Sequence, residues 1–281
     1  MVAVGAFPLA RDSRVAYARP MPDRVAFSSA RLPIEHFDER FSPDNLAFWV
    51  PRLIECAQIQ PGHRVLDVGC GTGGFARALA EMATATVTGI DYWERFIVFA
   101  RELPAPQRGA VDWRVGSAEA LPVSDGSFDR VLLSLVLHQL ADPELAVAEA
   151  FRALDTGGRV LVRTIAPEDA ADRVPERFVP AIAAADVERM PLLDEIEGWL
   201  RDAGFAVTER RRVLRNKKLN LADEERQLLV DARSRYSFVS AAELDAGLRR
   251  MRADATAHGA NWVDPRPTHF IAASKSASTR T

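Results

Sequence analysis

The sequence predicts an α/β fold in which a mostly parallel β-sheet carries helices on both faces. Segments with strand character and segments with helix character alternate between residues 64 and 165, which is the pattern of parallel strands joined by right-handed helical crossovers. The segment 128–137 is almost continuously apolar, as expected of a strand covered on both faces. A glycine-rich turn, residues 69–74, joins a short apolar strand directly to a helix.

Each element up to residue 165 is predicted from its own local pattern. Apolar residues at helical spacing predict a helix over 45–57, and the turn Pro61-Gly62 separates it from a buried strand over 64–68. Pro143 starts a later helix, and Gly157-Gly158 follow its end. The other expected elements are helices over 75–82, 95–102 and 143–154, and strands over 86–90 (ending at Asp91), 112–115, 128–137 and 159–165.

The C-terminal part is less regular. We expect an inserted helix over 177–189, a helix over 192–203, a strand over 206–214 and a last strand over 268–274. A helical stretch over 222–256, broken near Ser237, separates the two strands.

Composition narrows the class of protein. Of 281 residues, 48% are hydrophobic and 27% charged, and the formal net charge is -3. This composition is sufficient for a buried core. It disfavours a duplex nucleic-acid partner, because proteins that bind duplexes normally carry an excess of basic residues. Cys56 and Cys70 show no metal-ligand spacing, so no metal site is expected, and they fit a reducing cytosol.

The beginning of the chain carries no secretory or membrane signal that we recognise. No apolar run approaches the roughly 20 residues of a membrane helix, and no basic segment precedes the mildly apolar first residues. We therefore expect a cytoplasmic protein without a membrane partner. The Arg-, Pro- and Ala-rich residues 1–33 fit a poorly ordered arm or an active-site flap better than a transit peptide.

The glycine-rich turn matches a general nucleotide-binding pattern. Gly69, Gly71 and Gly74 satisfy GxGxxG between a strand and a helix, which by itself suits a dinucleotide. Asp67 argues against that ligand, because a carboxylate at the end of the strand repels an approaching pyrophosphate. The Asp67 carboxylate suits a ligand whose nearby end is cationic.

Four segments together resemble the class I S-adenosylmethionine-dependent methyltransferases. They are Val65-Leu66-Asp67-Val68-Gly69-Cys70-Gly71-Thr72-Gly73, then Asp91, then Gly116-Ser117-Ala118-Glu119-Ala120-Leu121-Pro122, and finally Phe128-Asp129 with Leu137-His138-Gln139-Leu140 and Leu154-Asp155-Thr156-Gly157-Gly158-Arg159. The last set resembles the branch that acts on small metabolites, including quinone-biosynthesis-like enzymes. The resemblance implies a Rossmann-like, seven-stranded sheet whose last strand is antiparallel.

The resemblance also implies a role for each residue of the cofactor site. Asp67 and the turn residues Gly69, Cys70, Gly71 and Gly73 would hold the methionine end of S-adenosylmethionine. Asp91 would accept hydrogen bonds from the ribose hydroxyls, and Tyr92 would lie along the adenine. The remaining positions are Ser117, Ala118 and Glu119 at the adenine edge, with the Ala118 amide donating to the ring, and Ser134 or Leu135 near the methionine. Many relatives carry Asp in place of Ser117, which would accept the same hydrogen bond without charge assistance.

The resemblance implies an arm or lid over 1–44 and a methyltransferase domain over 45–281. Helical insertions near 167–191 and 216–262 would form, with the arm, a lid over the substrate. The expected reaction is methyl transfer to an oxygen, nitrogen or carbon nucleophile of a small molecule such as a secondary metabolite. The sequence leaves the oligomeric state open, and a homodimer is compatible with it.

Several alternatives stay open beside these predictions. His138 is a candidate general base, although it would equally orient the substrate or bond the backbone, and His269 is expected to be structural. The basic residues between 210 and 218 fit a solvated edge strand or a site for an anionic group. Phe37, Phe41, Phe48 and Trp49 fit a cofactor cap or a core helix.

Other reactions remain as rival hypotheses. Ser134-Leu135-Val136-Leu137 stands where a nucleic-acid methyltransferase would show an Asn/Asp-Pro-Pro-aromatic motif, which argues against base methylation. Asp67 disfavours a nicotinamide dehydrogenase. A relative of the fold that binds the cofactor but catalyses another reaction, such as a cyclisation, stays an alternative.

Overall fold

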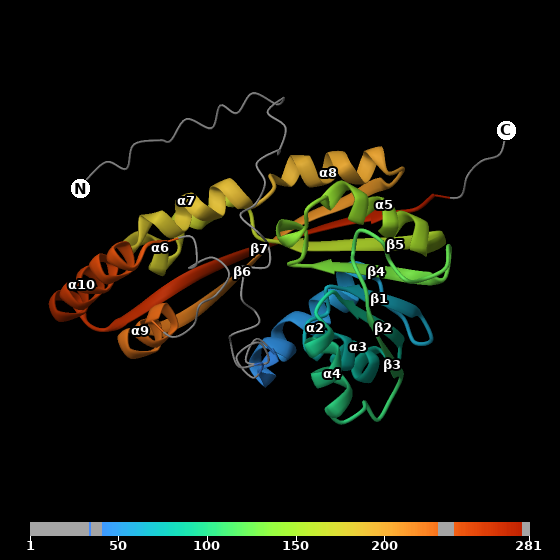
Figure 1. Cartoon of the computed structure of the whole chain (residues 1–281), viewed down its shortest axis with the longest axis horizontal. Helices are drawn as coiled ribbons and strands as arrows, with labels where there is room; N and C mark the ends of the chain where they lie inside the picture. The colour runs from blue at the N-terminus through green and yellow to red at the C-terminus, as the bar shows by residue number, and fades with distance from the viewer. Residues whose placement is uncertain (1–33, 35–40, 230–238, 277–281) are drawn as a thin grey trace. The chain divides into compact units, whose positions relative to one another are not determined.

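A computed structural model describes residue 34 and residues 41–229 and 239–276 of the chain. These residues form a seven-stranded sheet with the strand order β3-β2-β1-β4-β5-β7-β6 (Figure 1). The strands are β1 (Arg64–Val68), β2 (Thr86–Asp91), β3 (Ala110–Val115), β4 (Phe128–Ser134), β5 (Leu154–Thr164), β6 (Ala206–Asn220) and β7 (Asn261–Ser274). All neighbours from β3 to β5 are parallel, whereas β7 is antiparallel to both β5 and β6. The predicted α/β class and the antiparallel last strand are confirmed.

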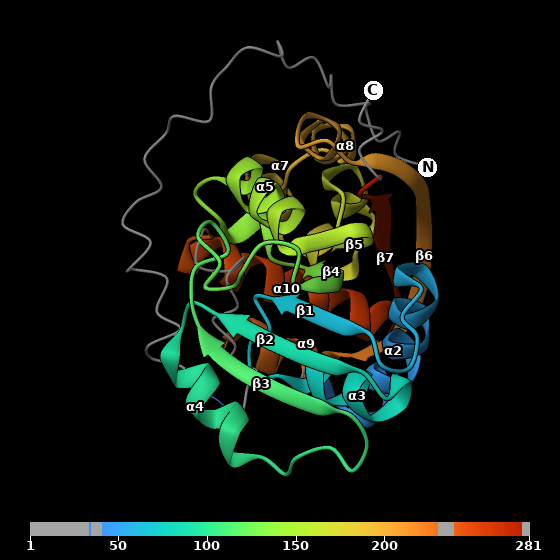
Figure 2. The same cartoon turned by 90° about the vertical axis from the view of Figure 1, so that its right-hand side faces the viewer.

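Helices cover both faces of this sheet (Figure 2). On one face, α2 (Pro43–Ala57) and α3 (Gly74–Ala83) share a core with Val65, Leu132 and Phe270, and α4 (Glu94–Glu102) packs on β2 and β3. On the other face, α5 (Pro143–Ala153) and α8 (Leu193–Asp202) share a core with Leu133 and Ile271. Local signals start these helices: Pro43 stands at the beginning of α2, and the Asp142 carboxylate accepts the Leu145 amide at 2.9 Å to cap α5.

The order of the strands places a switch point beside β1. The chain moves from β1 outward to β2 and β3, and then returns to β4 and β5 on the other side of β1. Connections on the two sides therefore leave β1 and β4 in opposite directions, which opens a crevice at their carboxyl ends. Every predicted cofactor residue lies at the carboxyl end of β1, β2, β3 or β4 or in the segment that follows it.

Three of the predicted elements differ in their boundaries. The fourth strand ends at Ser134 rather than at residue 137, because Leu135 takes a left-handed conformation with φ 57° and Leu137–Gln139 form a 3-10 helix. The inserted helix over 177–189 is two helices, α6 (Val174–Phe178) and α7 (Pro180–Arg189), since Pro180 starts a new one. The strand expected from residue 159 begins at Leu154, with an irregularity in its pairing to β4 that accommodates Gly157 at φ 79°.

The largest difference is in β6 and β7, which are longer than predicted. They pair with each other as far as Asn220 opposite Asn261, so the ends of the insertion predicted over 216–262 are strand rather than helix. The pairing of β5 with β7 stops at Thr164 opposite His269. Residues 261–268 and their β6 partners therefore continue beyond the carboxyl end of β5, by roughly 25 Å at the usual rise of a strand.

Helices surround this extension of β6 and β7 (Figure 1). They are α6, α7, α9 (Leu221–Leu229) and α10 (Ala241–His258), and we call these four helices the cap. The cap has its own apolar core, formed by Val179, Ile182, Val239, Leu248 and Met251. The arm predicted over residues 1–44 lies outside the described residues up to residue 40, apart from residue 34. Within the described ranges, none of the helices is both long and apolar enough to cross a membrane.

Candidate functional site

The glycine-rich turn leaves β1 and leads into α3 in a conformation that needs its glycines. Gly69, Gly71 and Gly73 have φ values of 72°, 57° and 80°, in the left-handed region that glycine enters without a steric cost. A Cβ atom at Gly69 would lie 2.6 Å from Val136 Cγ2, and one at Gly73 would lie 2.1 Å from Trp113 Cη2. A Cβ at Gly71 would meet nothing within 4 Å. Gly71 is therefore the glycine of the turn that faces open space.

Asp91 ties the end of β2 to this turn. Its Oδ2 accepts the Gly71 amide at 2.8 Å, and its Oδ1 accepts the Trp93 amide at 2.9 Å. The Ile90 carbonyl accepts the amides of Gly69 and Cys70 at 2.8 and 3.0 Å. The carboxylate is thus oriented at the sheet edge by hydrogen bonds to both of its oxygens.

Asp67 lies at the end of β1, where its side chain is only 3% exposed. Burial, together with repulsion from the Asp91 carboxylate, raises the pKa of Asp67 to about 7. The neighbouring Cys70 is also buried, and burial raises the pKa of its thiol well above the ordinary value, so Cys70 stays a neutral thiol. A cation beside Asp67 would stabilise its ionised form.

The third predicted segment follows β3 and approaches the same edge. The Gly116 amide donates to the Asp91 carbonyl at 3.0 Å, which links the two strand ends. Ser117 Oγ accepts the Glu119 amide at 3.1 Å, and Glu119 Oε1 accepts the Asp142 amide at 2.7 Å. Ala118 is buried. The Glu119 side chain thus holds the loop before α5 and has a structural partner of its own.

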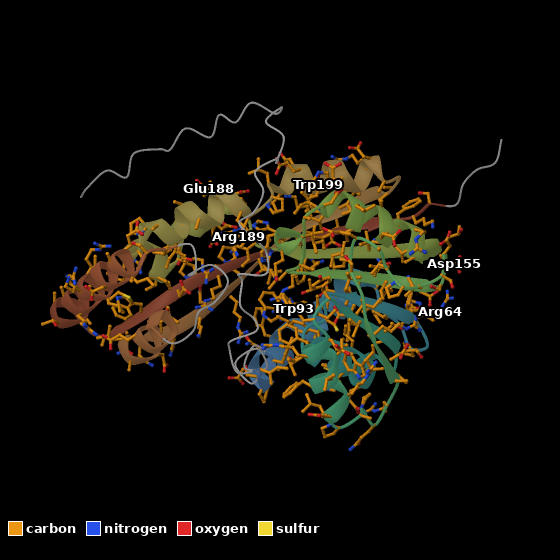
Figure 3. The ribbon with its side chains drawn as sticks, viewed as in Figure 1. Arg64, Trp93, Asp155, Glu188, Arg189 and Trp199 are labelled. Carbon is orange, nitrogen blue, oxygen red and sulfur yellow. The ribbon has the colours of Figure 1, made fainter. Side chains whose placement is uncertain are left out.

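Tyr92 and Trp93 extend the edge beyond Asp91. The Tyr92 side chain is 69% exposed and packs edge-on against Trp93, with ring centroids 5.6 Å apart. Figure 3 shows Trp93 at the opposite end of the sheet from Arg64 and Asp155. Arg64 begins β1 and is 3.4 Å from Asp155 Oδ2. The predicted site therefore lies at the carboxyl edge, and this ion pair marks the amino edge.

The end of β4 supplies the remaining predicted residues. Ser134 pairs with Arg163 of β5, and the Leu135 amide donates to the Arg163 carbonyl at 2.8 Å. His138 is half-buried in the 3-10 helix that follows. The structure therefore brings Asp67, the glycine turn, Asp91, the Ser117–Glu119 loop and Ser134 to one edge of the sheet, with His138 just beyond it.

The two other features singled out in the sequence have structural partners. His269 is buried, and its Nε2 lies 2.6 Å from Asp169 Oδ2, in agreement with its expected structural role. In the basic run, Arg210 pairs with Asp194 at 2.8 Å and Arg211 with Glu55 at 2.8 Å. These two arginines fit the solvated edge strand.

Sequence reasoning missed two residues that line the site. The Trp113 indole of β3 occupies the space that a Cβ would need at Gly73 and at Gly89, where the nearest ring atoms are 2.1 and 2.6 Å away. Arg163 is buried at the end of β5, over the rings of Trp49 and Phe75. The only sign of Arg163 in the sequence is its own charge within the apolar part of the fifth strand. Trp49 belongs to the core, as the core-helix alternative expects, and Phe41 packs on Phe75 with ring centroids 5.2 Å apart. A cofactor cap formed by these aromatics stays a prediction, and Phe37 lies outside the described residues.

Comparison with known proteins identifies the class. Residues 66–162 match the Methyltransferase domain family. The chain is 35% identical over 170 residues to the ubiquinone/menaquinone biosynthesis C-methyltransferase UbiE of Methylobacterium nodulans, covering 52% of this chain and 68% of that protein. Two solved structures share the fold. A protein assigned as a methyltransferase from Bacillus halodurans has a TM-score of 0.58 and 22% identity, covering 83% of this chain and 100% of that one. The [4+2]-cyclase SpnF has a TM-score of 0.56 and 23% identity, covering 82% of this chain and 81% of that one.

The chain belongs to the class I S-adenosylmethionine-dependent methyltransferases. It is a methyltransferase enzyme whose cofactor is S-adenosylmethionine.

The residues at the carboxyl edge fit this cofactor. Gly71 leaves open the space that a side chain would fill, and Asp91 holds its carboxylate at the neighbouring strand end. Asp67 and Asp91 give the edge a negative potential, which suits the sulfonium and amino groups of the cofactor.

Proposed function

We propose that this enzyme transfers a methyl group to a carbon, oxygen or nitrogen nucleophile of a small molecule that binds between the carboxyl edge of the sheet and the cap. The extension of β6 and β7 past Thr164 carries this proposal, because it projects from the same edge that holds the candidate cofactor site. Loops and insertions at this edge build the substrate pocket in open α/β sheets.

Each candidate residue would have a separate task. Asp67 and the turn around Gly71 would hold the methionine end, and Asp91 would accept the ribose hydroxyls. Ser117 and Ala118 would contact the adenine. When bound, the cofactor supplies an electrophilic methyl group, and the protein would accelerate transfer mainly by holding the nucleophile about 3 Å from it in line.

The similar protein from Methylobacterium nodulans supports a class of acceptor, because it is named as a ubiquinone/menaquinone biosynthesis C-methyltransferase. A quinol or phenol offers a nucleophilic carbon and a nucleophilic oxygen in one ring. We therefore propose an aromatic, hydroxylated acceptor of this kind, within secondary or quinone metabolism.

A screen with methyl-labelled S-adenosylmethionine tests the proposal. The purified chain is incubated with small quinols, phenols and amines, and in parallel with RNA and with protein. We expect label in one of the small molecules and in neither polymer. Label confined to a polymer would overturn the proposal.

The same assay separates methyl transfer from a reaction that needs only the bound cofactor. S-adenosylhomocysteine replaces S-adenosylmethionine while the acceptor is kept constant, and consumption of the acceptor is followed. We expect consumption to stop. Continued conversion would establish a chemistry other than methylation, as in the cyclase that shares the fold.

A further inference from the structure

Arg163 is a buried cation at the candidate site without a counter-ion. It is 6% exposed, and burial together with the charge of Arg215 lowers its pKa to about 9. No carboxylate forms an ion pair with it within the described ranges, and its Nε has no hydrogen-bond partner there. Such a group is costly to bury, because a charge removed from water is normally paired.

The position of the Arg163 guanidinium is fixed by its neighbours. It lies 4.1 Å from the ring centroid of Trp49 in α2 and 5.3 Å from that of Phe75 in the first turn of α3. One terminal nitrogen donates to Ser134 Oγ at 3.3 Å. The guanidinium thus stands between the start of α3, just after the glycine turn, and the end of β4. Both of these border the proposed binding site.

A second arginine increases the positive charge here. Arg215 of β6 lies 4.9 Å from the ring centroid of Phe48 and donates to Asn45 Oδ1 in α2. Arg52 lies 3.8 Å from the same ring of Phe48. Arg210 and Arg211 in the same strand form ion pairs with acidic side chains, whereas Arg215 donates to an amide oxygen and to the Asp44 backbone carbonyl, with the Asp44 carboxylate as an electrostatic neighbour.

Arg159 provides a contrast within the same strand. It is four residues from Arg163, it is also buried, and as an even-numbered step along the strand it lies on the same face. Its guanidinium donates to the Cys56 carbonyl at 2.9 Å and to Thr208 Oγ1 at 2.9 Å, and it lies 3.5 Å from Glu209. The fold can therefore supply a carboxylate to a buried arginine on this face, and the described residues supply none to Arg163.

We propose that Arg163 binds an anionic oxygen group, a carboxylate or an ionised hydroxyl, of a molecule held at the carboxyl edge of the sheet. Guanidinium groups bind such groups through charge-assisted hydrogen bonds, and stacking on aromatic rings leaves the N–H edge free for them. Two sources have this chemistry: the methionine carboxylate of the cofactor, and an acidic group of the acceptor. The inference rests on the cofactor and acceptor sites proposed above.

Calorimetry with the Arg163→Met variant tests the proposal and distinguishes the sources. S-adenosylhomocysteine carries the carboxylate, and 5′-methylthioadenosine lacks it. If the cofactor is the source, the variant loses at least tenfold in affinity for the first ligand and keeps its affinity for the second.

The acceptor is tested on protein saturated with S-adenosylhomocysteine. The probes are 4-hydroxybenzoate and its neutral analogue 4-hydroxybenzamide. If the acceptor is the source, the wild-type protein prefers the benzoate at least tenfold, Arg163→Met abolishes this preference, and the affinity for S-adenosylhomocysteine is unchanged. If neither the cofactor affinity nor an acid preference depends on Arg163, the proposal is overturned.

Arg159→Met is the matched control. It leaves the Cys56 carbonyl and Thr208 Oγ1 without the Arg159 donor, and Glu209 with Arg211 alone among the described residues, so we expect a lower melting temperature and unchanged ligand affinities. Arg163→Met removes an unpaired buried charge, so we expect a melting temperature equal to or above that of the wild type. If Arg163→Met fails to fold, Arg163→Gln allows the same comparison. None of these measurements requires turnover, so they stay informative if methylation of a small molecule is not observed.

Discussion

Asp67 predicts that cofactor affinity depends on pH in the neutral range. In the ligand-free protein the pKa of Asp67 is raised to about 7 from an ordinary value of 3.8, by burial first and by the Asp91 carboxylate second. The difference of about 3 pH units corresponds to roughly 4 kcal/mol for ionising this side chain, at about 1.4 kcal/mol per unit. A cationic ligand beside Asp67 favours the ionised form and lowers this cost.

The sign of the effect follows from where the proton is held. The folded chain keeps the Asp67 proton up to about pH 7, whereas the unfolded chain releases it near 3.8. The folded state therefore binds more protons between these values, and ligand-free stability falls as the pH rises through that window. S-adenosylmethionine binding should instead strengthen with rising pH, up to tenfold for each unit between pH 5.5 and 7, and level off near 7.5.

Calorimetry in two buffers of different ionisation enthalpy measures both the Kd and the protons released. At pH 6 we expect close to one proton released for each cofactor bound, because the ligand's amino group stays protonated at this pH. Asp67→Asn should bind weakly and almost independently of pH, while His138→Gln should keep the wild-type dependence. A Kd that does not change between pH 5.5 and 7, or an Asp67→Asn variant with the wild-type profile, would refute the reasoning.

Three further predictions follow from the same edge of the sheet. Asp91→Ala should weaken S-adenosylhomocysteine binding by about 1–3 kcal/mol in calorimetry, because it removes a buried acceptor; an unchanged affinity would refute the ribose assignment. Gly73→Ala should lower the melting temperature, since the new Cβ would lie 2.1 Å from the Trp113 ring. Gly71→Ala should lower the melting temperature less and weaken cofactor binding, since its Cβ enters open space. Equal effects of the two variants on melting temperature and on affinity would contradict these separate roles. His138→Gln should reduce kcat less than tenfold if alignment dominates, and a loss of 10²-fold or more would assign a general base.

The parallel part of the fold was predictable because each signal is local. Short apolar strands, glycines after β1 and an aspartate at the end of β2 each follow from a few neighbouring residues, and the parallel order brings the strand ends together. The positions of Asp67, Asp91 and Ser134 at one edge follow from this rule. The roles of these residues remain proposals.

The extension of β6 and β7 had no comparable signal. Beyond Leu214 the two strands pair only with each other, so neither has a face buried under helices on the sheet. Pro265 and Pro267 interrupt any strand pattern in β7, and this is tolerated because the segment lies past the end of β5. The pattern that predicts strands elsewhere, alternation or an apolar run, is therefore missing.

The missed residues depend on long-range packing. Trp113 is important because Gly73 and Gly89, from two other parts of the chain, both leave room for its ring. Arg163 becomes notable only when it is compared with Arg159, which has a carboxylate partner whereas Arg163 has none among the described residues. The partners of Arg159 come from α2, β6 and β7 and cannot be inferred from one strand. Leu135 adopts a left-handed conformation that leucine rarely takes, so the end of β4 could not be placed from residue type.

Charge is distributed unevenly along this edge. Asp67 and Asp91 end β1 and β2, and Arg163 ends β5, so β4 separates an acidic side from a basic side. A ligand with both charges, such as the amino-acid end of S-adenosylmethionine, would satisfy the two sides together, because its ammonium would neutralise Asp67 while its carboxylate faced Arg163. If the cofactor carboxylate did not reach Arg163, a neutral acceptor would leave this buried cation without an anion in the bound state, which its burial makes unfavourable. The charge pattern therefore requires an anion at the β5 side, and the ligand that brings it decides whether Arg163 acts on cofactor affinity or on the choice of acceptor.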